Sequence, residues 1–518
     1  MSHRFDTAQK DFDSRFLEFL GRRREAEGDV SRQVAGILER VRLEGDAALR
    51  EYTKKFDHFE LPHNEAFAIP EEAIITAFEM CEPETIDALR LAAERIEAFH
   101  RRQLPEDLFF TDDIGVGLGY RWKPLQSVGL YVPGGTASYP SSVLMNAIPA
   151  RIAGVPRIAI ATPTPQGAIQ PLVLAAAHIA GITEIYRLGG AHAIAALAFG
   201  CDGIERVDKI IGPGNAFVAE AKRQVFGICG IDAIAGPSEI VVLAEGDNNA
   251  GRAEPGGRAT VGLPSQAEPA GQAEQVKQAK SAEQAGWAEQ TEQAEQTEQA
   301  GQVKQVKQVK PAEQTEQAGQ VKQVKQVKPA EQAGWAEWIA ADLLSQAEHD
   351  TSARAILITD NAALGDEVAK AVEAQLASLP RKDIAGESWK NFGAIILVKS
   401  MGEGAEIVDR LAPEHLEIFS ENAGQIAETI HNAGAIFLGA HTPETIGDYL
   451  GGSNHVLPTN ATARFASGLS TLDFLKRTSL LQCPPEALAK LAPAAVTLAQ
   501  AEGLDAHARA VKLRMKKP

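Results

Sequence analysis

The sequence at residues 127–135 reads SVGLYVPGG, and three runs of the same kind follow it: RIAIATP at 157–163, EIYRLGG at 184–190 and DKIIGPG at 208–214. Each run is short and apolar, ends at glycine or proline, and is followed by an alanine-rich stretch with helical spacing. Strands that alternate with helices in this way indicate βαβ units and a parallel sheet. The sequence therefore predicts an α/β protein.

A second set of alternating elements lies late in the chain: ARAILITD at 353–360, DEVAKAVEAQLASL at 366–379, FGAIILV at 392–398, GEGAEIVDRLAP at 402–413, HLEIFS at 415–420 and NAGAIFLG at 432–439. Residues from about 30 to 104 have helical spacing instead, first at Val34, Ile37, Leu38 and Val41 and then at Ile86, Leu89, Leu91 and Ile96. We therefore expect two Rossmann-like parallel-sheet domains, a helical N-terminal region and a small C-terminal extension.

A low-complexity insertion at 250–336 separates the two sets. It consists almost wholly of Gln, Glu, Ala, Lys, Val and Gly, and TEQAGQVKQVKQVKPAEQ at 297–314 is repeated at 315–332. Such a composition offers too little apolar surface for a core, so we expect disorder or a frayed, solvated helix. An interaction segment remains an alternative, but repeat expansion in a surface loop is the simpler interpretation.

The expected domain limits follow from these patterns. Residues 1–110 would form the helical region that packs on the first α/β domain, and 111–237 would form that domain. Residues 238–249 and 337–460 would form the second α/β domain, interrupted by the insertion, and 461–518 would form the C-terminal segment.

Composition excludes several classes of protein. The net charge of -18 over 518 residues argues against a nucleic-acid partner, because phosphate binding needs clustered Lys and Arg. No run of 18 apolar residues occurs and the first residues carry no apolar leader, so we expect neither a membrane span nor secretion. The four cysteines, Cys81, Cys201, Cys229 and Cys483, show no CxxC spacing, which favours a reducing cytoplasm over a disulfide framework or a thiolate zinc site.

Polar residues gather at four places. Gln346 and His349 lie three apart in WIAADLLSQAEHD, where a surface helix is the simpler reading and a shared metal the alternative. Glu414 and His415 stand at the entrance of an apolar strand, as an acid–base pair or merely a polar loop. The other places are TIGDYLGGSNHVLPT, with Asp448 and His455 among glycines, and the terminal AEGLDAHARAVKLRMKK, with Glu502 and His507 five apart on an expected helix.

Two further patterns concern ligands. Gln346, His349, Asp448 and His507 together offer the nitrogen and oxygen atoms that Zn²⁺ accepts. No GxGxxG turn opens a helix after a strand, and LGGAHAIAALAFG at 188–200 and IIGPGNAFV at 210–218 are the nearest substitutes for a dinucleotide turn. Sharp strand-to-helix turns alone would also explain those two segments.

Long motifs in one order give the chain a specific resemblance. They are GLYVPGGTASYPSSVLMNAIPARIAGV, LGGAHAIAALAFG, VDKIIGPGNAFVAEAKRQV, IDAIAGPSEI, DLLSQAEHD, PEHLEI, GDYLGGSNHVLPT, SGLSTLDFLKR and AEGLDAHARAV. With them the chain resembles the histidinol dehydrogenase family over nearly its whole length except the insertion. The resemblance implies NAD-dependent, four-electron oxidation of L-histidinol through L-histidinal to L-histidine, the last step of histidine biosynthesis. It also implies one Zn²⁺ per subunit that orients the substrate, and a homodimer with shared active sites.

The resemblance also assigns roles to residues. The zinc ligands would be Gln346, His349, Asp448 and His507, and the acid–base pair would be Glu414 and His415. Substrate contacts would come from Ser238, Gln346, His349, His415, Asp448, His455, Glu502 and His507, and NAD contacts from Tyr131, His192 and Asn215. His192 departs from the Gln frequent in the family, for which we expect altered cofactor affinity.

Three questions stay open at this point. Glu502 and His507 could act within their own subunit or in a partner's site. A paralogous zinc and NAD alcohol dehydrogenase acting on another small alcohol is the nearest rival function, which Ser238, His455 and Glu502 argue against. A catalytically dead scaffold converted to an interaction module is the other rival, which the intact Glu414 and His415 argue against.

Overall fold

The computed structural model describes residues 2–21, 27–62, 66–134, 139–246 and 334–515. Nearly all of the expected insertion lies outside the described residues, so the expectation of disorder concerns residues that the structure does not describe. The helix α11 (Trp335–Ala347) begins one residue before the expected end of the insertion at Ala336. Within the described part of the chain, no helix combines the length and apolar character that a membrane span requires.

The first parallel sheet has five strands in the order β6-β5-β4-β7-β8. Its strands are β4 (Ser127–Tyr131), β5 (Arg157–Thr162), β6 (Glu184–Arg187), β7 (Lys209–Ile211) and β8 (Gly230–Ile231). The helices between them are α6 (Pro140–Ile152), α7 (Pro171–Ala180), α8 (Gly190–Phe199) and α9 (Ala216–Val225). Every strand expected here from the opening motifs is present.

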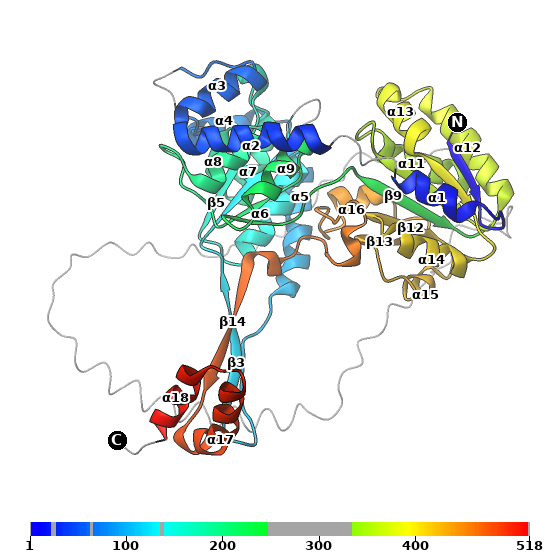
Figure 1. Ribbon diagram of the computed structural model, residues 1–518. Helices are drawn as coiled ribbons and strands as arrows, with labels where there is room; N and C mark the ends of the chain where they lie inside the picture. Colours follow the sequence, from blue (N-terminus) through cyan, green and yellow to red (C-terminus); the bar gives the residue numbers. More distant parts are fainter. Residues whose placement is uncertain (1, 22–26, 63–65, 135–138, 247–333, 516–518) are drawn as a thin grey trace, which may run out of the picture. The chain divides into compact units, whose positions relative to one another are not determined.

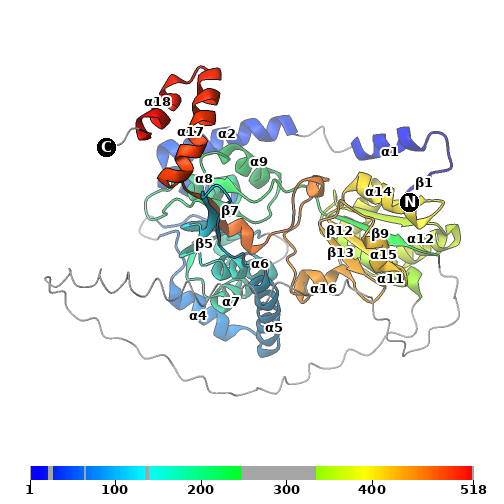
Figure 2. The same ribbon diagram turned by 90° about the horizontal axis from the view of Figure 1, so that it is seen from below.

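Two apolar layers cover this sheet, one on each face. The helices α4 (Glu71–Met80) and α5 (Pro83–His100) pack with α6 and α7, whereas α2 (Glu27–Glu44) and α3 (Asp46–Phe56) pack with α8 and α9. Figure 2 shows these two groups on opposite sides of the strands. The residues expected on one apolar helix face are buried in α2, namely Val34, Ile37, Leu38 and Val41. In α5, however, Leu91 is 41% exposed.

The second parallel sheet has six strands in the order β1-β11-β10-β9-β12-β13. They are β1 (His3–Asp6), β9 (Glu239–Ala244), β10 (Arg354–Thr359), β11 (Ala394–Leu397), β12 (His415–Phe419) and β13 (Ala435–Leu438). One face is covered by α11, α12 (Ala362–Leu376) and α13 (Lys382–Phe392), and the other by α1 (Phe12–Gly21), α14 (Met401–Leu411) and α15 (Ala423–Ala427). The short α16 (Glu444–Tyr449) follows β13 (Figure 1).

The first residues of the chain differ from expectation. β1 pairs in parallel with β11 at the edge of the second sheet, and Phe5, Phe12, Phe16 and Phe19 are buried against that sheet's core. The helical region expected at 1–110 therefore does not pack as one body on the first α/β domain. Residues 3–21 belong to the second sheet, and the helices from α2 onward belong to the first.

The C-terminal segment contains a small antiparallel sheet that the sequence reading did not anticipate. β14 (Leu475–Gln482) pairs with β3 (Gly117–Pro124), which pairs with β2 (Leu108–Thr111). Figure 1 shows β3 and β14 side by side, followed by α17 (Pro485–Ala501) and α18 (Asp505–Arg514). The terminal stretch expected as one helix is thus two helices, because Gly503, with φ 74°, turns the chain between them.

The insertion interrupts one core. β9 precedes it with all six residues buried, and α11 follows it with Ile339 and Leu343 packed against Ile240 and Val242 of β9. The two flanks are therefore neighbours in the same apolar layer.

Candidate active site

The candidate acid–base pair lies where β12 enters the second sheet. His415 is the first residue of β12 and stands beside Ile240 of β9 in the parallel register. Ala412 takes a left-handed conformation, with φ 48°, where α14 ends, and the chain then turns through Pro413 into the strand. Both members of the pair are buried, since Glu414 is 6% exposed and His415 is 3% exposed. The expected position at a strand entrance is confirmed.

Glu414 is held by hydrogen bonds from the segment that leads into β9. Its Oε2 accepts a hydrogen bond from the Glu239 N–H at 3.0 Å, and the Ser238 side chain also bonds to this carboxyl group. Burial nevertheless raises the pKa of Glu414 well above its ordinary value, because the charged form loses its hydration. A carboxyl group with a raised pKa can gain and lose a proton closer to neutral pH, as general acid–base catalysis requires.

His415 has two ring nitrogens in different surroundings. Nδ1 lies 3.2 Å from the Glu239 carbonyl oxygen, and a carbonyl can only accept, so the proton sits on Nδ1. Nε2 has no hydrogen-bond partner among the described residues, and burial lowers the pKa of His415 to about 3. The ring is therefore neutral at pH 7, with the lone pair of Nε2 available to take a proton.

Two more acids come close to His415 from the helix α16. Nδ1 of His415 lies 3.4 Å from Glu444 Oε1, and Nε2 lies 3.8 Å from Asp448 Oδ1. One ligand atom of each of His415, Glu444 and Asp448 falls within 4.8 Å of the others. Burial is the main cause that raises the pKa of Glu444 well above its ordinary value and that of Asp448 to about 6. A cation would stabilise their ionised forms.

Gln346 and His349 approach the same place from α11. The helix ends at Ala347, so His349 lies in the turn that follows rather than on the expected helix, and its Nδ1 is 3.2 Å from Gln346 Nε2. Gln346 is fully buried, and its Oε1 has no partner among the described residues. His349 and Asp448 interact electrostatically. Three of the four expected zinc ligands therefore come together.

His455 adjoins this group. Its Nδ1 lies 3.0 Å from the Asp448 carbonyl oxygen, and its Nε2 lies 3.4 Å from Ser142 Oγ on α6. Burial lowers the pKa of His455 to about 4, so this ring is also neutral at pH 7. Ser238, Asp448 and His455 thus lie beside Glu414 and His415.

Glu502 and His507 do not join the group within one chain. Glu502 caps the C-terminus of α17 and His507 lies on α18, and both side chains are exposed. Among the described residues, the metal-ligand group around Asp448 includes neither of them.

The three expected NAD contacts line one cavity of about 270 Å³ in the first α/β domain, together with Asp57 and residues of two glycine turns. The Tyr131 hydroxyl accepts a hydrogen bond from the Gly190 N–H at 3.0 Å, and Asn215 caps α9 through its side chain. His192 is 1% exposed, and neither ring nitrogen has a partner among the described residues. At Gly212, φ is 118° and a Cβ would collide with the Tyr131 carbonyl oxygen, which explains the glycine in the motif IIGPG.

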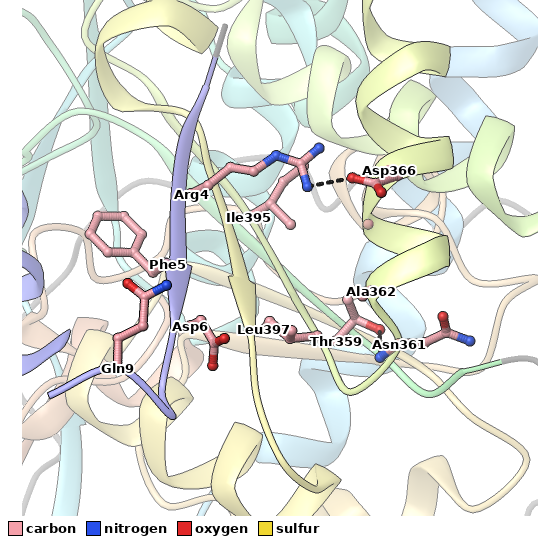
Figure 3. Close-up of a pocket in the computed structure, with 11 residues that line it drawn as sticks. Arg4, Phe5, Asp6, Gln9, Thr359, Asn361, Ala362, Asp366, Ile395 and Leu397 are labelled. Carbon is pink, nitrogen blue, oxygen red and sulfur yellow. Dashed lines mark hydrogen bonds and ion pairs between the residues drawn. The ribbon is translucent and has the colours of Figure 1, made fainter.

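A second cavity, of about 290 Å³, lies beside β1, β10 and β11 (Figure 3). An Arg4–Asp366 ion pair of 2.6 Å crosses it, and Asn361 caps α12 at its edge. None of the expected site residues lines this cavity.

Sequence reasoning missed Glu444, Glu239 and Asp57 as neighbours of the two sites. Glu444 is four residues before Asp448, a same-face spacing on a helix that could have drawn attention to it. For Glu239 and Asp57 no local signal exists, because both reach their sites through tertiary packing.

Comparisons with known proteins agree with the resemblance. The family model described as histidinol dehydrogenase matches residues 20–330 and 329–515. The chain is 48% identical to the histidinol dehydrogenase of Mesorhizobium japonicum over 505 residues, covering 98% of this chain and 97% of the relative. It is also 48% identical to that of Bradyrhizobium diazoefficiens over 515 residues, covering 99% of each. The crystal structure of histidinol dehydrogenase from Elizabethkingia anophelis matches with a TM-score of 0.78 and 30% identity, covering 99% of this chain and 98% of that one.

Proposed function

The chain belongs to the histidinol dehydrogenase family, an oxidoreductase family of histidine biosynthesis, and from that premise we propose how its residues perform the reaction. The activity is that of EC 1.1.1.23. L-histidinol is oxidised through L-histidinal to L-histidine with two NAD⁺. One observation supports the assignment of this reaction to particular residues. His415 is neutral, its Nε2 has no partner among the described residues, and it lies beside the buried carboxyl group of Glu414.

His415 serves the first oxidation. Its Nε2 takes the proton from the hydroxyl oxygen of histidinol while a hydride leaves the carbon that carries this hydroxyl group for the nicotinamide, so the alcohol becomes an aldehyde. The hydrogen bond from Nδ1 to Glu239 O fixes the ring orientation, and Glu444 stabilises the imidazolium that forms.

Glu414 serves the second oxidation. The aldehyde must add water before a second hydride can leave, and the Glu414 carboxylate takes a proton from that water. Ser238 and the Glu239 N–H hold the carboxyl group in place for this step. Burial of the site keeps the reactive aldehyde away from bulk solvent between the two steps.

Gln346, His349 and Asp448 suit a Zn²⁺ ion, one per subunit. The buried Gln346 Oε1 without a partner would otherwise cost free energy, and a cation would satisfy it. A bound Zn²⁺ would supply Lewis-acid positioning of the imidazole and amino nitrogens of histidinol. His455 and Ser238 would then contact the substrate beside it.

NAD would occupy the cavity lined by Tyr131, His192 and Asn215. The unpaired ring nitrogens of the buried His192 fit a ligand that donates or accepts hydrogen bonds there. Gly134 after β4, and Gly189 and Gly190 after β6, line the same cavity and let the backbone approach a bound dinucleotide closely.

The fourth zinc ligand would be the His507 of a second copy of the chain, with Glu502 completing the substrate site. Exposure of both residues supports this arrangement. So does the apolar surface of β2, where Leu108, Phe109 and Phe110 are 44%, 54% and 48% exposed. We therefore propose a homodimer with shared active sites.

The three parts of the chain would have separate roles in the reaction. The first α/β domain would hold NAD, the second would hold zinc and the acid–base pair, and the C-terminal segment would complete a partner's site. The unpaired cysteines agree with a reducing cytoplasm.

The test is an assay of NADH production from L-histidinol by purified, zinc-loaded protein, with and without a chelator. We expect two NADH per histidinol, and loss of activity with the chelator. One NADH per substrate, or none, would overturn the proposed function.

A further inference from the structure

We propose that the Asp57 carboxylate binds the 2′-hydroxyl of the adenosine ribose of NAD, and so makes the cofactor site select NAD over NADP. The inference rests on the proposed function, because it concerns how the chain recognises the cofactor of that reaction. Asp57 comes from the helical N-terminal region, as do Ile37 and Phe56 of the same cavity, and not from the sheet.

The strand order of the first sheet points to this role. Along the chain, β4, β5, β6, β7 and β8 are the first to fifth strands, so the order β6-β5-β4-β7-β8 is 3-2-1-4-5. Sheets of this order bind dinucleotides at their carboxyl ends, and an acidic residue near the end of the second strand binds the ribose hydroxyl. Here the second strand is β5, and the residues after it read PTPQG, which contain no acid.

Asp57 supplies the missing acid at the end of β5. It caps the C-terminus of α3, and its carbonyl oxygen accepts a hydrogen bond from the Gln166 N–H at 2.6 Å. Its carboxylate accepts a second hydrogen bond from the backbone of Thr164. Two contacts therefore fasten Asp57 to the segment that directly follows the second strand.

One carboxylate oxygen of Asp57 is left for a ligand. Asp57 is 7% exposed, and its Oδ2 has no hydrogen-bond partner among the described residues. The side chain lines the same cavity as Tyr131 and His192. A buried, unpaired carboxylate oxygen is costly, and a ribose hydroxyl is a donor that can satisfy it.

The charge of the cavity explains why NADP would be rejected. Among the described lining residues, Asp57 is the one acid, and neither Lys nor Arg is present. Burial lowers the pKa of His192 to about 3, so this ring is neutral. Lys55 lies over the Phe56 ring, and it and His58 stand outside the lining. A 2′-phosphate would thus meet a carboxylate, and no Lys or Arg among the described lining residues would offset the repulsion.

The experiment measures equilibrium binding by calorimetry, separately from turnover. The probes are NAD, NADP, 5′-AMP and adenosine 2′,5′-bisphosphate, and the proteins are the full chain, Asp57→Asn and Asp57→Ser. Asn keeps an acceptor for Thr164, and Ser leaves room for a phosphate. Glu60→Gln is the matched control, because Glu60 is a nearby acid paired with Lys54 on the surface.

We expect the full chain and Glu60→Gln to bind NAD and 5′-AMP, with weak or undetectable binding of the two 2′-phosphorylated probes. Asp57→Asn and Asp57→Ser should bind NAD roughly 10-fold more weakly and lower the preference for NAD over NADP by more than that. Thermal melting checks that the variants are folded. An unchanged preference in two folded variants would overturn the inference, whereas a full chain that neither binds NAD nor produces NADH would overturn the proposed function instead.

Discussion

At the scale of single residues, burial sets the protonation states that the proposed chemistry needs. The ring of His415 is neutral because it lies inside the protein, and its proton is on Nδ1 because a carbonyl oxygen faces that atom. Glu414 shares the same strand entrance, yet its pKa moves upward instead of downward, since burial disfavours the charged form of both groups. His415 is therefore a neutral base, and the adjacent carboxyl group of Glu414 titrates closer to neutral pH than an ordinary glutamate does.

The two half-reactions can be separated at this pair. Glu414→Gln keeps an acceptor for the Glu239 N–H but removes the group that takes a proton from water. We expect oxidation of L-histidinal to fall by about 10²- to 10⁴-fold, and the conversion of L-histidinol to the aldehyde to fall far less. His415→Asn should instead abolish the first conversion. Rapid-mixing measurements of NADH, started once from each substrate, distinguish these outcomes.

The pH dependence of the second step provides a further check on the same variant. Only the ionised carboxylate can accept the proton, so kcat/KM for L-histidinal should rise as pH increases through the raised pKa of Glu414. Glu414→Gln should lack that rise. Equal loss of both half-reactions in Glu414→Gln would contradict the division of roles.

The metal ligands give a second prediction at this scale. We expect Gln346→Ala and His349→Ala to lose most of the bound zinc, because they remove ligands from α11 and the turn after it. Glu444→Gln should keep its zinc, since we assign Glu444 to the imidazolium of His415. Metal analysis of the purified variants is the measurement. If Glu444→Gln loses its zinc and His349→Ala keeps it, the proposed ligand set is wrong. The ion would then bind at the group formed by His415, Glu444 and Asp448.

The sequence could predict which residue types gather at the site but not their environment. The Glu414–His415 neighbourhood was visible because an apolar strand follows it directly. The hydrogen bonds from Ser238 and Glu239 to Glu414 join positions about 175 residues apart, and no local pattern encodes them. The same is true of the buried state of Glu444.

At the scale of elements, the N-terminal segment shows where periodicity fails. Four phenylalanines at positions 5, 12, 16 and 19 are buried there, but their spacing in the sequence does not identify the sheet that they cover. β1 joins β11 across more than 380 residues, and parallel pairing depends on the tertiary path of the chain. Strands flanked by their own helices, such as β4 to β7, were predictable because their partners lie nearby in the sequence.

Phe16 and Leu17 test this placement on one helix. Phe16 of α1 is fully buried with Phe5 and Phe12, whereas its neighbour Leu17 is 61% exposed. Phe16→Ala should lower the free energy of unfolding by about 3–5 kcal/mol, because it leaves a cavity against the second sheet. Leu17→Ala should change it by less than about 1 kcal/mol. Urea unfolding followed by tryptophan fluorescence measures both, and equal effects would contradict the packing of α1 on that sheet.

At the scale of the whole molecule, the chain keeps one family's architecture on both sides of a long interruption. β9 and α11 belong to one apolar layer although residues 247–333 separate their described neighbours. The entropic cost of closing a loop grows only with the logarithm of its length, so a core can tolerate a long interruption. Packing across the flanks, rather than the residues between them, would then hold Ser238 near Gln346 and His349.

Removing the interruption tests this argument. We expect that replacing residues 250–333 by a Gly–Ser linker of about ten residues leaves turnover within about 2-fold and adds about 1–2 kcal/mol of stability, because the shorter loop loses less entropy on closure. A matched deletion that continues through Trp338 should unfold or inactivate the protein, since Trp335 packs edge-on against Phe419 and Trp338 contacts His441. Steady-state NADH assays and thermal melting compare the two variants with the full chain. Collapse of activity in the first deletion, with zinc and NAD binding lost, would mean that the insertion itself supports the site.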